Sequence, residues 1–263
     1  MTAPAGGQWA DSAWPDLARY LDKSEERNLV GLVPVGAIEQ HGPHLPVGTD
    51  ALIAGALCAR AAELAGCIAL PTILLGVSYG HGTRLPGTLS LTPDLLVATV
   101  HQYVRWAAVA GLRRLLFVNA HFGNAAALGV ATDHIRLHAP QLRVGVLAWW
   151  SATDHVLAEV TADGDDIHAN RAETSMMLAI APNLVLMDRA ADADEPDRTN
   201  GLVFRYTAAA LSLNGVTGRP SEATVELGNL LVEEVVEEIA ARVQRGQIEE
   251  PPLGPVPAPD FPF

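Results

Sequence analysis

The chain has 263 residues, of which 49% are hydrophobic, so it can bury one substantial core and a single domain is the expected organisation. Its formal net charge of −13 at pH 7 argues against nucleic acid and anionic membranes as partners, because both would repel it. The sequence shows neither a secretory leader nor a run near the roughly 20 apolar residues of a membrane span, which predicts a cytoplasmic protein with a small-molecule partner.

Lysine and cysteine are both scarce in this sequence. Lys23 is the only lysine and no Gly-rich loop lies beside it, which disfavours a Walker-type phosphate loop and a Schiff-base enzyme. The two cysteines, Cys58 and Cys67, do not form a CxxC pattern. We therefore expect ordinary buried thiols rather than a redox or metal site.

Strand and helix patterns alternate along the first half of the chain. In order, the predicted elements are a helix over 9–21, a strand over 29–35, a helix over 51–64, a strand over 67–74 and a helix from its cap at Thr92 to about residue 110. A long loop separates the last two elements and contains the Gly-rich segment 76–82. Such a loop is typical of an active site.

The second half continues the same alternation. Its predicted elements are a strand over 114–118, a helix over 125–138, a strand over 142–150, a short helix over 172–180 and a last helix from Ser221 to about Val243. Repeated strand–helix units predict an α/β fold with a mainly parallel sheet and helices on both faces. We expect one domain over 1–248, followed by an extended tail over 249–263 that contains six prolines.

Polar clusters follow the strands at three places. Glu39, His41 and Asp50 come directly after the first strand, His121 follows the strand over 114–118, and Glu173 opens a later helix. Loops beyond the carboxyl ends of parallel strands are where α/β sheets bind ligands, so these side chains are expected to converge. Either histidine alone would be interpreted as a hydrogen-bonded loop residue. Together, three carboxylates and two imidazoles favour a site for Zn²⁺, Mn²⁺ or Fe²⁺.

Two divalent ions fit this set, because one carboxylate can bridge a pair of metals. Asp50 is the expected bridge, although it could instead cap the helix over 51–64. His168 lies outside the proposed ligand set and near Glu173 in sequence, so it is the candidate proton donor to a leaving nitrogen.

A rival motif is present in the same loop region. Residues 76–80, Gly-Val-Ser-Tyr-Gly, match the G-x-S-x-G nucleophile elbow of serine hydrolases with Ser78 as nucleophile. An elbow requires a helix immediately after the serine, whereas glycines and a proline follow here, so the match is interpreted as accidental. Alternation along the strand over 142–150 leaves Trp150 free to line the pocket, and we expect it to contact substrate with Phe122 and His81.

Several segments together resemble the creatininase (creatinine amidohydrolase) family. The most specific block is Val33-Pro34-Val35-Gly36 with Glu39-Gln40-His41-Gly42-Pro43-His44-Leu45-Pro46 and Asp50. Further matches are Leu85-Pro86-Gly87-Thr88, Asn119-Ala120-His121-Phe122-Gly123-Asn124, and His168 followed by Glu173-Thr174-Ser175. The likeness spans about residues 28–243.

The resemblance implies a three-layer α/β/α sandwich, a two-metal hydrolytic site that cleaves a carbon–nitrogen bond, and a homo-oligomer that is often a hexamer. Carried over by position, Glu39, Asp50 and His121 would hold one metal. His41, Asp50 and Glu173 would hold the other, with His168 and Glu173 in catalytic roles.

Two departures disfavour creatinine itself as the substrate. The chain has Phe122-Gly123 where creatinine-hydrolysing members have Tyr-Glu, and Gly164 where they have a substrate-facing tryptophan. We therefore expect a dinuclear metal-dependent amidohydrolase acting on another small cyclic or modified amide. The alternatives are a peptidase that trims a modified peptide in cofactor or natural-product maturation, and a non-catalytic oligomeric scaffold of the same fold.

Overall fold

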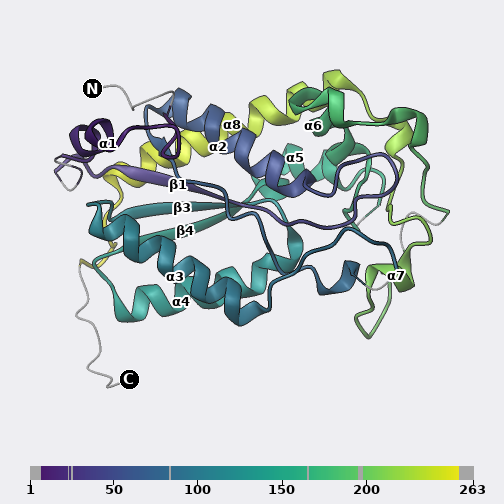
Figure 1. The fold of residues 1–263 in the computed structure, drawn as a ribbon, viewed down its shortest axis with the longest axis horizontal. Coiled ribbons are helices and arrows are strands. Elements are labelled where there is room, and N and C mark those ends of the chain that lie inside the picture. The colour runs from purple at the N-terminus through teal and green to yellow at the C-terminus, as the bar shows by residue number, and fades with distance from the viewer. Residues whose placement is uncertain are drawn as a thin grey trace.

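The centre of the fold is a four-stranded sheet in which every pairing is parallel (Figure 1). The computed structural model describes residues 7–22, 24, 26–82, 84–164, 166–194 and 198–254. The strands are β1 (Val30–Val35), β2 (Ile68–Ala69), β3 (Arg114–Asn119) and β4 (Arg143–Ala148), in the spatial order β2-β1-β3-β4. This arrangement confirms the predicted α/β class with a parallel sheet.

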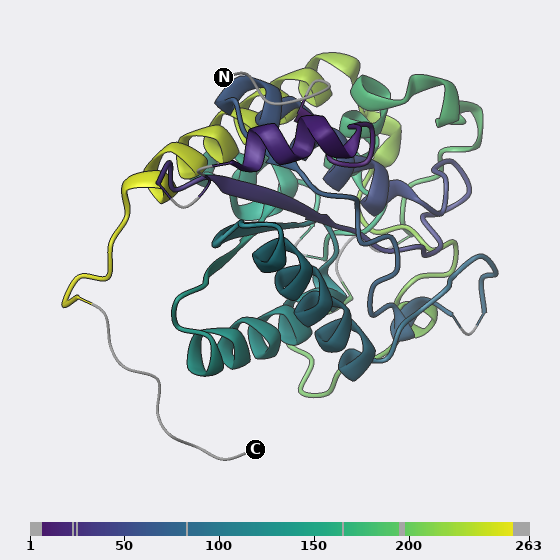
Figure 2. The same ribbon diagram turned by 60° about the vertical axis from the view of Figure 1, so that its left-hand side comes forward.

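Helices cover both faces of the sheet (Figures 1 and 2). One face carries α2 (Thr49–Ala65) and α8 (Val225–Ile248), with α6 (Arg171–Ile180) packed against both. The other face carries α3 (Pro93–Val109) and α4 (Ala125–His138). The remaining helices are α1 (Trp14–Leu21), α5 (Asp154–Val160) and α7 (Ala208–Leu211). The layers are those of the predicted α/β/α sandwich.

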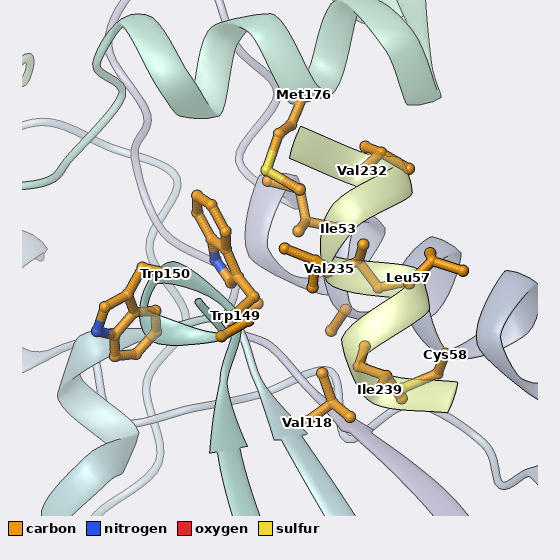
Figure 3. Close-up of a cluster of buried hydrophobic side chains, with 14 of the residues drawn as sticks. Ile53, Leu57, Cys58, Val118, Trp149, Trp150, Met176, Val232, Val235 and Ile239 are labelled. Atoms are coloured by element: carbon orange, nitrogen blue, oxygen red, sulfur yellow. The ribbon is translucent and has the colours of Figure 1, made fainter. Parts of the chain in front are cut away.

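Strand β1 explains why two separate cores form. Its side chains alternate, so Val30 and Leu32 join the core under α2 and α8, while Val33 and Val35 join the core under α3 and α4. Figure 3 shows the first core, where side chains of α2 and α8 meet above Val118 of β3 and beside Trp149 and Trp150. Burial on both faces is why this strand is apolar throughout.

Several predicted boundaries differ from those of the structure. Helix α1 begins at Trp14 rather than Trp9, because Gln8 pairs with Ala69 at the sheet edge and Pro15 opens the helix. Strand β2 stops at Ala69 rather than Leu74, because Pro71 lacks the N–H of a continuing ladder. Beyond it, Ile73 makes a single bridge to Val35.

Two later elements also differ from the prediction. Strand β4 ends at Ala148, and Trp149–Ser151 form a 3-10 turn, so the tryptophans do not alternate along a strand. Helix α8 begins at Val225, where the Thr224 side chain accepts a hydrogen bond from the Leu227 N–H, and Pro220–Glu222 form a separate turn. The helix continues to Ile248, five residues beyond the predicted end.

The described start of the tail lies at the amino-terminal end of the strands. Arg114 donates hydrogen bonds to the carbonyls of Gly246 and Glu249 and pairs with the Glu250 carboxylate at 3.1 Å, and Arg143 pairs with the same carboxylate. The rest of the predicted tail, 255–263, lies outside the described residues. No helix in the described ranges combines the length and the apolar character that a membrane crossing requires.

Both cysteines are free and buried, as predicted. Burial raises the pKa of the Cys67 thiol to about 12, with a smaller opposing effect from a backbone hydrogen bond, and raises the pKa of Cys58 as well. Neither thiol therefore has the character of a redox or metal-binding group.

A substitution at Gly228 tests the close contact between α8 and α6. A Cβ atom at this position would lie 1.9 Å from the Ser175 carbonyl oxygen, so Gly228→Ala should force the helices apart and lower the free energy of unfolding by about 2 kcal/mol. Gly129 is the matched control, since it lies in the exposed face of α4 with open space around it. Gly129→Ala should raise the free energy of unfolding by up to about 1 kcal/mol. Urea titrations followed by circular dichroism measure both changes, and equal effects would contradict this packing.

Candidate metal centre

The loop after β1 brings three carboxylate and imidazole side chains to the carboxyl end of the sheet. Glu39 is held by a 2.8 Å hydrogen bond from its N–H to the Val47 carbonyl, which closes the loop. Asp50 lies within the first turn of α2, which begins at Thr49 and has Gly48 as its cap residue. The alternative role of Asp50 as a helix cap is therefore wrong, and its carboxylate is available to the cluster.

Two groups of three potential ligands meet at Asp50. The first contains Glu39, Asp50 and His121, and the second contains His41, Asp50 and Glu173; within each group the ligand atoms lie within 4.8 Å of one another. Asp50 Oδ2 is 3.3 Å from His121 Nδ1, whereas Asp50 Oδ1 is 3.2 Å from His41 Nε2. The two oxygens of one carboxylate thus face different groups, which is the arrangement a bridging ligand requires.

The cluster is buried and lacks internal partners for some of its atoms. Each of the five residues is at most 6% exposed. Among the described residues, Glu39 Oε2, Asp50 Oδ2 and His41 Nε2 have no hydrogen-bond partner. Three buried carboxylates are costly unless cations accompany them, so this donor set fits divalent metal ions.

The pKa values of His41 and His121 also show that the cluster favours positive charge. Burial lowers the pKa of His41, but the Asp50 and Glu173 carboxylates raise it by more, so the pKa lies well above its usual value. For His121, burial also lowers the pKa, and Glu39 and Asp50 again reverse the effect. The pKa of Asp50 is in turn held well below its usual range, because both histidines outweigh burial.

Backbone carbonyls orient both histidines toward the cluster. His121 Nε2 lies 2.9 Å from the Val77 carbonyl oxygen, so this nitrogen donates and the Nδ1 atom faces Glu39 and Asp50. His41 Nδ1 lies 3.3 Å from the Glu39 carbonyl oxygen, which directs Nε2 toward Asp50 and Glu173. Metal-ligating histidines are commonly held by such a bond from the second ring nitrogen.

Glu173 is positioned by the first turn of α6. The Asn170 side chain accepts a hydrogen bond from the Glu173 N–H at 3.1 Å, and Glu173 Oε2 accepts one from the Ala169 N–H at 2.5 Å. Asn170 is itself held by Asp163, whose carboxylate also accepts hydrogen bonds from the N–H groups of Arg171 and Arg219. Asp163 is thus a buried structural residue that gave no recognisable signal in the sequence.

Comparison with known proteins identifies the family of the chain. A family model for creatininase, described as creatinine amidohydrolase, matches residues 10–243. The chain belongs to the creatininase family.

Two relatives illustrate the range of the family. A mycofactocin precursor peptide peptidase from Mycobacterium ulcerans (strain Agy99) is 35% identical over 225 residues, covering 81% of this chain and 84% of the relative. A creatinine amidohydrolase from Pseudomonas putida is 32% identical over 228 residues, covering 81% of this chain and 88% of the relative. The family match and these relatives identify the chain as a hydrolase that acts on carbon–nitrogen bonds, as predicted.

Solved creatininases share the fold closely. A mutant creatininase of the Zn-Zn type has a TM-score of 0.77 and 30% identity, covering 90% of this chain and 97% of its own. The structure named Creatininase Mn has a TM-score of 0.76 and 29% identity, covering 91% of this chain and 98% of its own. This creatininase-family chain therefore has relatives that carry zinc or manganese.

Gln40 links two further histidines to the cluster. Its Oε1 atom accepts a hydrogen bond from the Gly42 N–H, so its Nε2 atom is the donor that faces His168 Nε2 at 2.8 Å and His81 Nδ1 at 3.2 Å. The opposite nitrogens, His168 Nδ1 and His81 Nε2, carry the protons and lie 3.5 and 3.7 Å from Glu39 Oε1. Gln40 was not singled out from the sequence, although it stands between Glu39 and His41 in the same motif.

Burial keeps His168 neutral. It lowers the pKa of His168 well below its usual value, and His41, His81 and His121 lower it further. His168 also belongs to a third group with Glu39 and His41 whose ligand atoms lie within 4.8 Å, so it borders the cluster directly.

Ser78 lies beside the cluster rather than on an exposed elbow. It is 1% exposed, and a 3-10 turn over Tyr79–His81 follows it in place of a helix. Its Oγ atom is 3.3 Å from His121 Nε2, farther than the Val77 carbonyl oxygen that the same nitrogen contacts. This geometry favours a role for His121 as a metal ligand. It disfavours a role as the base that activates a serine nucleophile.

A cavity of about 480 Å³ opens above the cluster. It is lined by Glu39, Asp50, His121, His168 and Glu173 of the cluster, by His81 and Phe122, and by residues between Thr199 and Thr217. The place of this last segment beside the cavity was not predicted. Apart from the turn at Asn214-Gly215-Val216, its sequence has no periodic pattern.

Phe122 and Trp150 form a stacked aromatic pair beside the cavity. Phe122 is 47% exposed and lines the cavity, whereas Trp150 is 8% exposed and is absent from the described residues that line it. The rings stack with their centroids 3.9 Å apart. Trp150 therefore supports Phe122 from behind. The expected strand alternation at the tryptophans is wrong, because the chain turns at Trp149 instead of continuing as a strand. A contact between Trp150 and the substrate stays a prediction.

His44 should make folding stability depend on pH. Its Nε2 atom is 2.8 Å from Thr174 Oγ1, and burial, with help from the His41 charge, lowers its pKa to about 4. The unfolded chain binds a proton near pH 6.5, so the stabilisation is complete at neutral pH and is lost as the pH falls toward 4. Between pH 7 and about 4.5, the metal-free protein should lose about 2 kcal/mol of unfolding free energy through this residue.

Urea titrations of chelator-treated protein at several pH values measure this loss. His44→Gln removes the titrating group, so the variant should be less stable at pH 7 but should lose about 2 kcal/mol less on acidification. Parallel pH profiles for the two proteins would contradict a neutral buried His44.

Proposed function

We propose that this chain is a dinuclear metal-dependent amidohydrolase that cleaves the carbon–nitrogen bond of a small cyclic or modified amide. The observation that supports this most directly is the placement of Asp50, whose two oxygens face separate groups of ligands. Glu39, Asp50 and His121 would hold one ion, and His41, Asp50 and Glu173 the other. The zinc and manganese of the solved relatives support these metals for this site.

Divalent ions bound there would polarise the amide carbonyl and lower the pKa of water so that a nucleophile is available at neutral pH. The protein's own groups would then orient the substrate and move the proton. His168 is neutral, carries its proton on Nδ1 and lines the cavity. It would take up the proton that the attacking water loses and pass it to the leaving nitrogen, so it is the candidate for proton transfer. Gln40 holds this tautomer, and Phe122 offers an apolar face to the substrate.

A second candidate is a peptidase that trims a modified peptide. The size of the cavity, about 480 Å³, favours it, because a small ring would fill only part of this space. The relative with 35% identity is a peptidase of this kind. A screen of cyclic amides, formamides and short peptides with the metal-loaded protein, read by mass change, separates the two candidates.

The oligomeric state is a further part of the proposal. Large apolar side chains are exposed along α3, where Trp106 is 65% and Val109 is 71% exposed, which is typical of a surface that another subunit covers. We expect a homo-oligomer up to a hexamer. Light scattering should give a mass well above the 27.8 kDa of one chain.

Metal content tests the shared role of Asp50. The wild-type chain should bind about two ions, and Asp50→Asn should reduce this below about one, because the substitution weakens both groups at once. Glu39→Gln and Glu173→Gln should each remove about one ion. Glu226→Gln is the matched control, because Glu226 is exposed on α8 and away from the cluster. Elemental analysis after dialysis measures the content.

The competing functions give different results in the same experiments. Fewer than about one ion in the wild type, together with no amidase activity after Mn²⁺ or Zn²⁺ is added, would favour the non-catalytic scaffold. Activity that resists chelators and disappears in Ser78→Ala would favour a serine hydrolase.

A further inference from the structure

An unusual loop lies beside the cavity. Residues 201–206 read Gly-Leu-Val-Phe-Arg-Tyr, and all four of their large apolar side chains are exposed: Leu202 46%, Val203 87%, Phe204 72% and Tyr206 54%. A run of adjacent exposed apolar side chains is uncommon on a free surface and usually marks a binding site. Arg205 and Tyr206 of this loop line the cavity itself.

Arg205 stands out by its charge. Four carboxylates line the cavity, from Glu39, Asp50, Asp166 and Glu173, whereas Arg205 is the only arginine or lysine among the described residues that do so. Arg205 is exposed and makes no ion pair or side-chain hydrogen bond with the other described residues. An unused guanidinium beside a catalytic cavity is suited to bind an anionic group of a ligand.

The loop is held in place at its carboxyl-terminal end. Arg84 donates hydrogen bonds to the carbonyls of Ser212 and Leu213, and Arg198 donates one to the carbonyl of Leu211. Helix α7, which begins two residues after Tyr206, packs against the turn over Tyr79–His81, which also lines the cavity. Figure 1 shows α7 at the same end of the sheet as α6. The guanidinium is thus presented to the cavity by an anchored segment.

We propose that Arg205 binds a free carboxylate of the substrate, and that the neighbouring apolar side chains contact the part of the substrate next to it. The inference rests on the proposed amidohydrolase function and narrows its substrate to an amide with a free carboxylate, such as an N-acyl amino acid or the C-terminal end of a peptide. The planar guanidinium of Arg205 can pair with both oxygens of one carboxylate. The scissile bond would lie over the metal cluster, and the carboxylate would lie at Arg205 of the 201–206 loop.

The experiment uses matched pairs of ligands with the metal-loaded full chain. N-acetyl-phenylalanine and Phe-terminated dipeptides are compared with their carboxamides, which differ only in the charged group. Wild-type protein should bind the acids about tenfold more tightly than the carboxamides, since one hydrogen-bonded charge pair at a partly exposed site contributes on this scale. For any pair that is hydrolysed, the difference should appear in KM rather than in kcat.

Substitutions at the loop test the assignment. Arg205→Gln should abolish the preference for acids and leave carboxamide binding unchanged, and Arg205→Lys should retain part of the preference. Phe204→Ser should weaken acids and carboxamides alike. Arg60→Gln is the control for net charge, because Arg60 is exposed on α2 and does not line the cavity, and it should behave as the wild type.

Several results would overturn the inference without touching the proposed function. One is a preference for acids that survives in Arg205→Gln, since the carboxylate would then bind elsewhere, for example at the metals. Another is cleavage of neutral cyclic amides without binding of either member of any pair. A change in oligomer mass in Arg205→Gln or Phe204→Ser would also overturn it, because the loop would then be a contact between subunits. If the metal-loaded protein hydrolyses no amide in the wider screen, the proposed function itself fails.

Discussion

The arrangement at the end of the sheet depends on the repulsion among three buried carboxylates. Glu39, Asp50 and Glu173 are each at most 5% exposed, and such groups persist together only where positive charge accompanies them. The neighbouring backbone and side-chain contacts hold these groups where cations could bind. Carbonyl groups aim the ring nitrogens of His41 and His121 inward, and the first turn of α6 fixes the third carboxylate.

The sheet supplies the rigidity that such a cluster needs. The ligands come from segments that are far apart in sequence, yet β1 and β3 are adjacent and parallel, so the loops that follow them begin side by side. Helix α6 packs on α2 and α8, and this packing places Glu173 in the cluster. Cores on both faces of the sheet therefore contribute to the site, because a shift of either helix layer would move one set of ligands relative to the other.

Much of this organisation follows from local patterns in the sequence, and the exceptions have physical reasons. The alternation of apolar runs predicted the parallel sheet, and the position of polar residues after strands predicted which side chains would converge. The length of β2 and the turn at Trp149 were not predicted, since Pro71 and the stacking of Trp150 on Phe122 outweigh the apolar pattern. The segment over 199–217 reaches the cavity through contacts distant in sequence, which no short motif encodes.

The two buried thiols have a practical consequence for studying this enzyme in solution. Cys58 and Cys67 are the only cysteines of the sequence, and both are shielded and poorly ionised. A single cysteine introduced at Val203, the most exposed position of the 201–206 loop, would then be the preferred target of a thiol-reactive fluorophore. Such a label would report in real time on molecules that bind at this loop, and neither native cysteine would need to be replaced first.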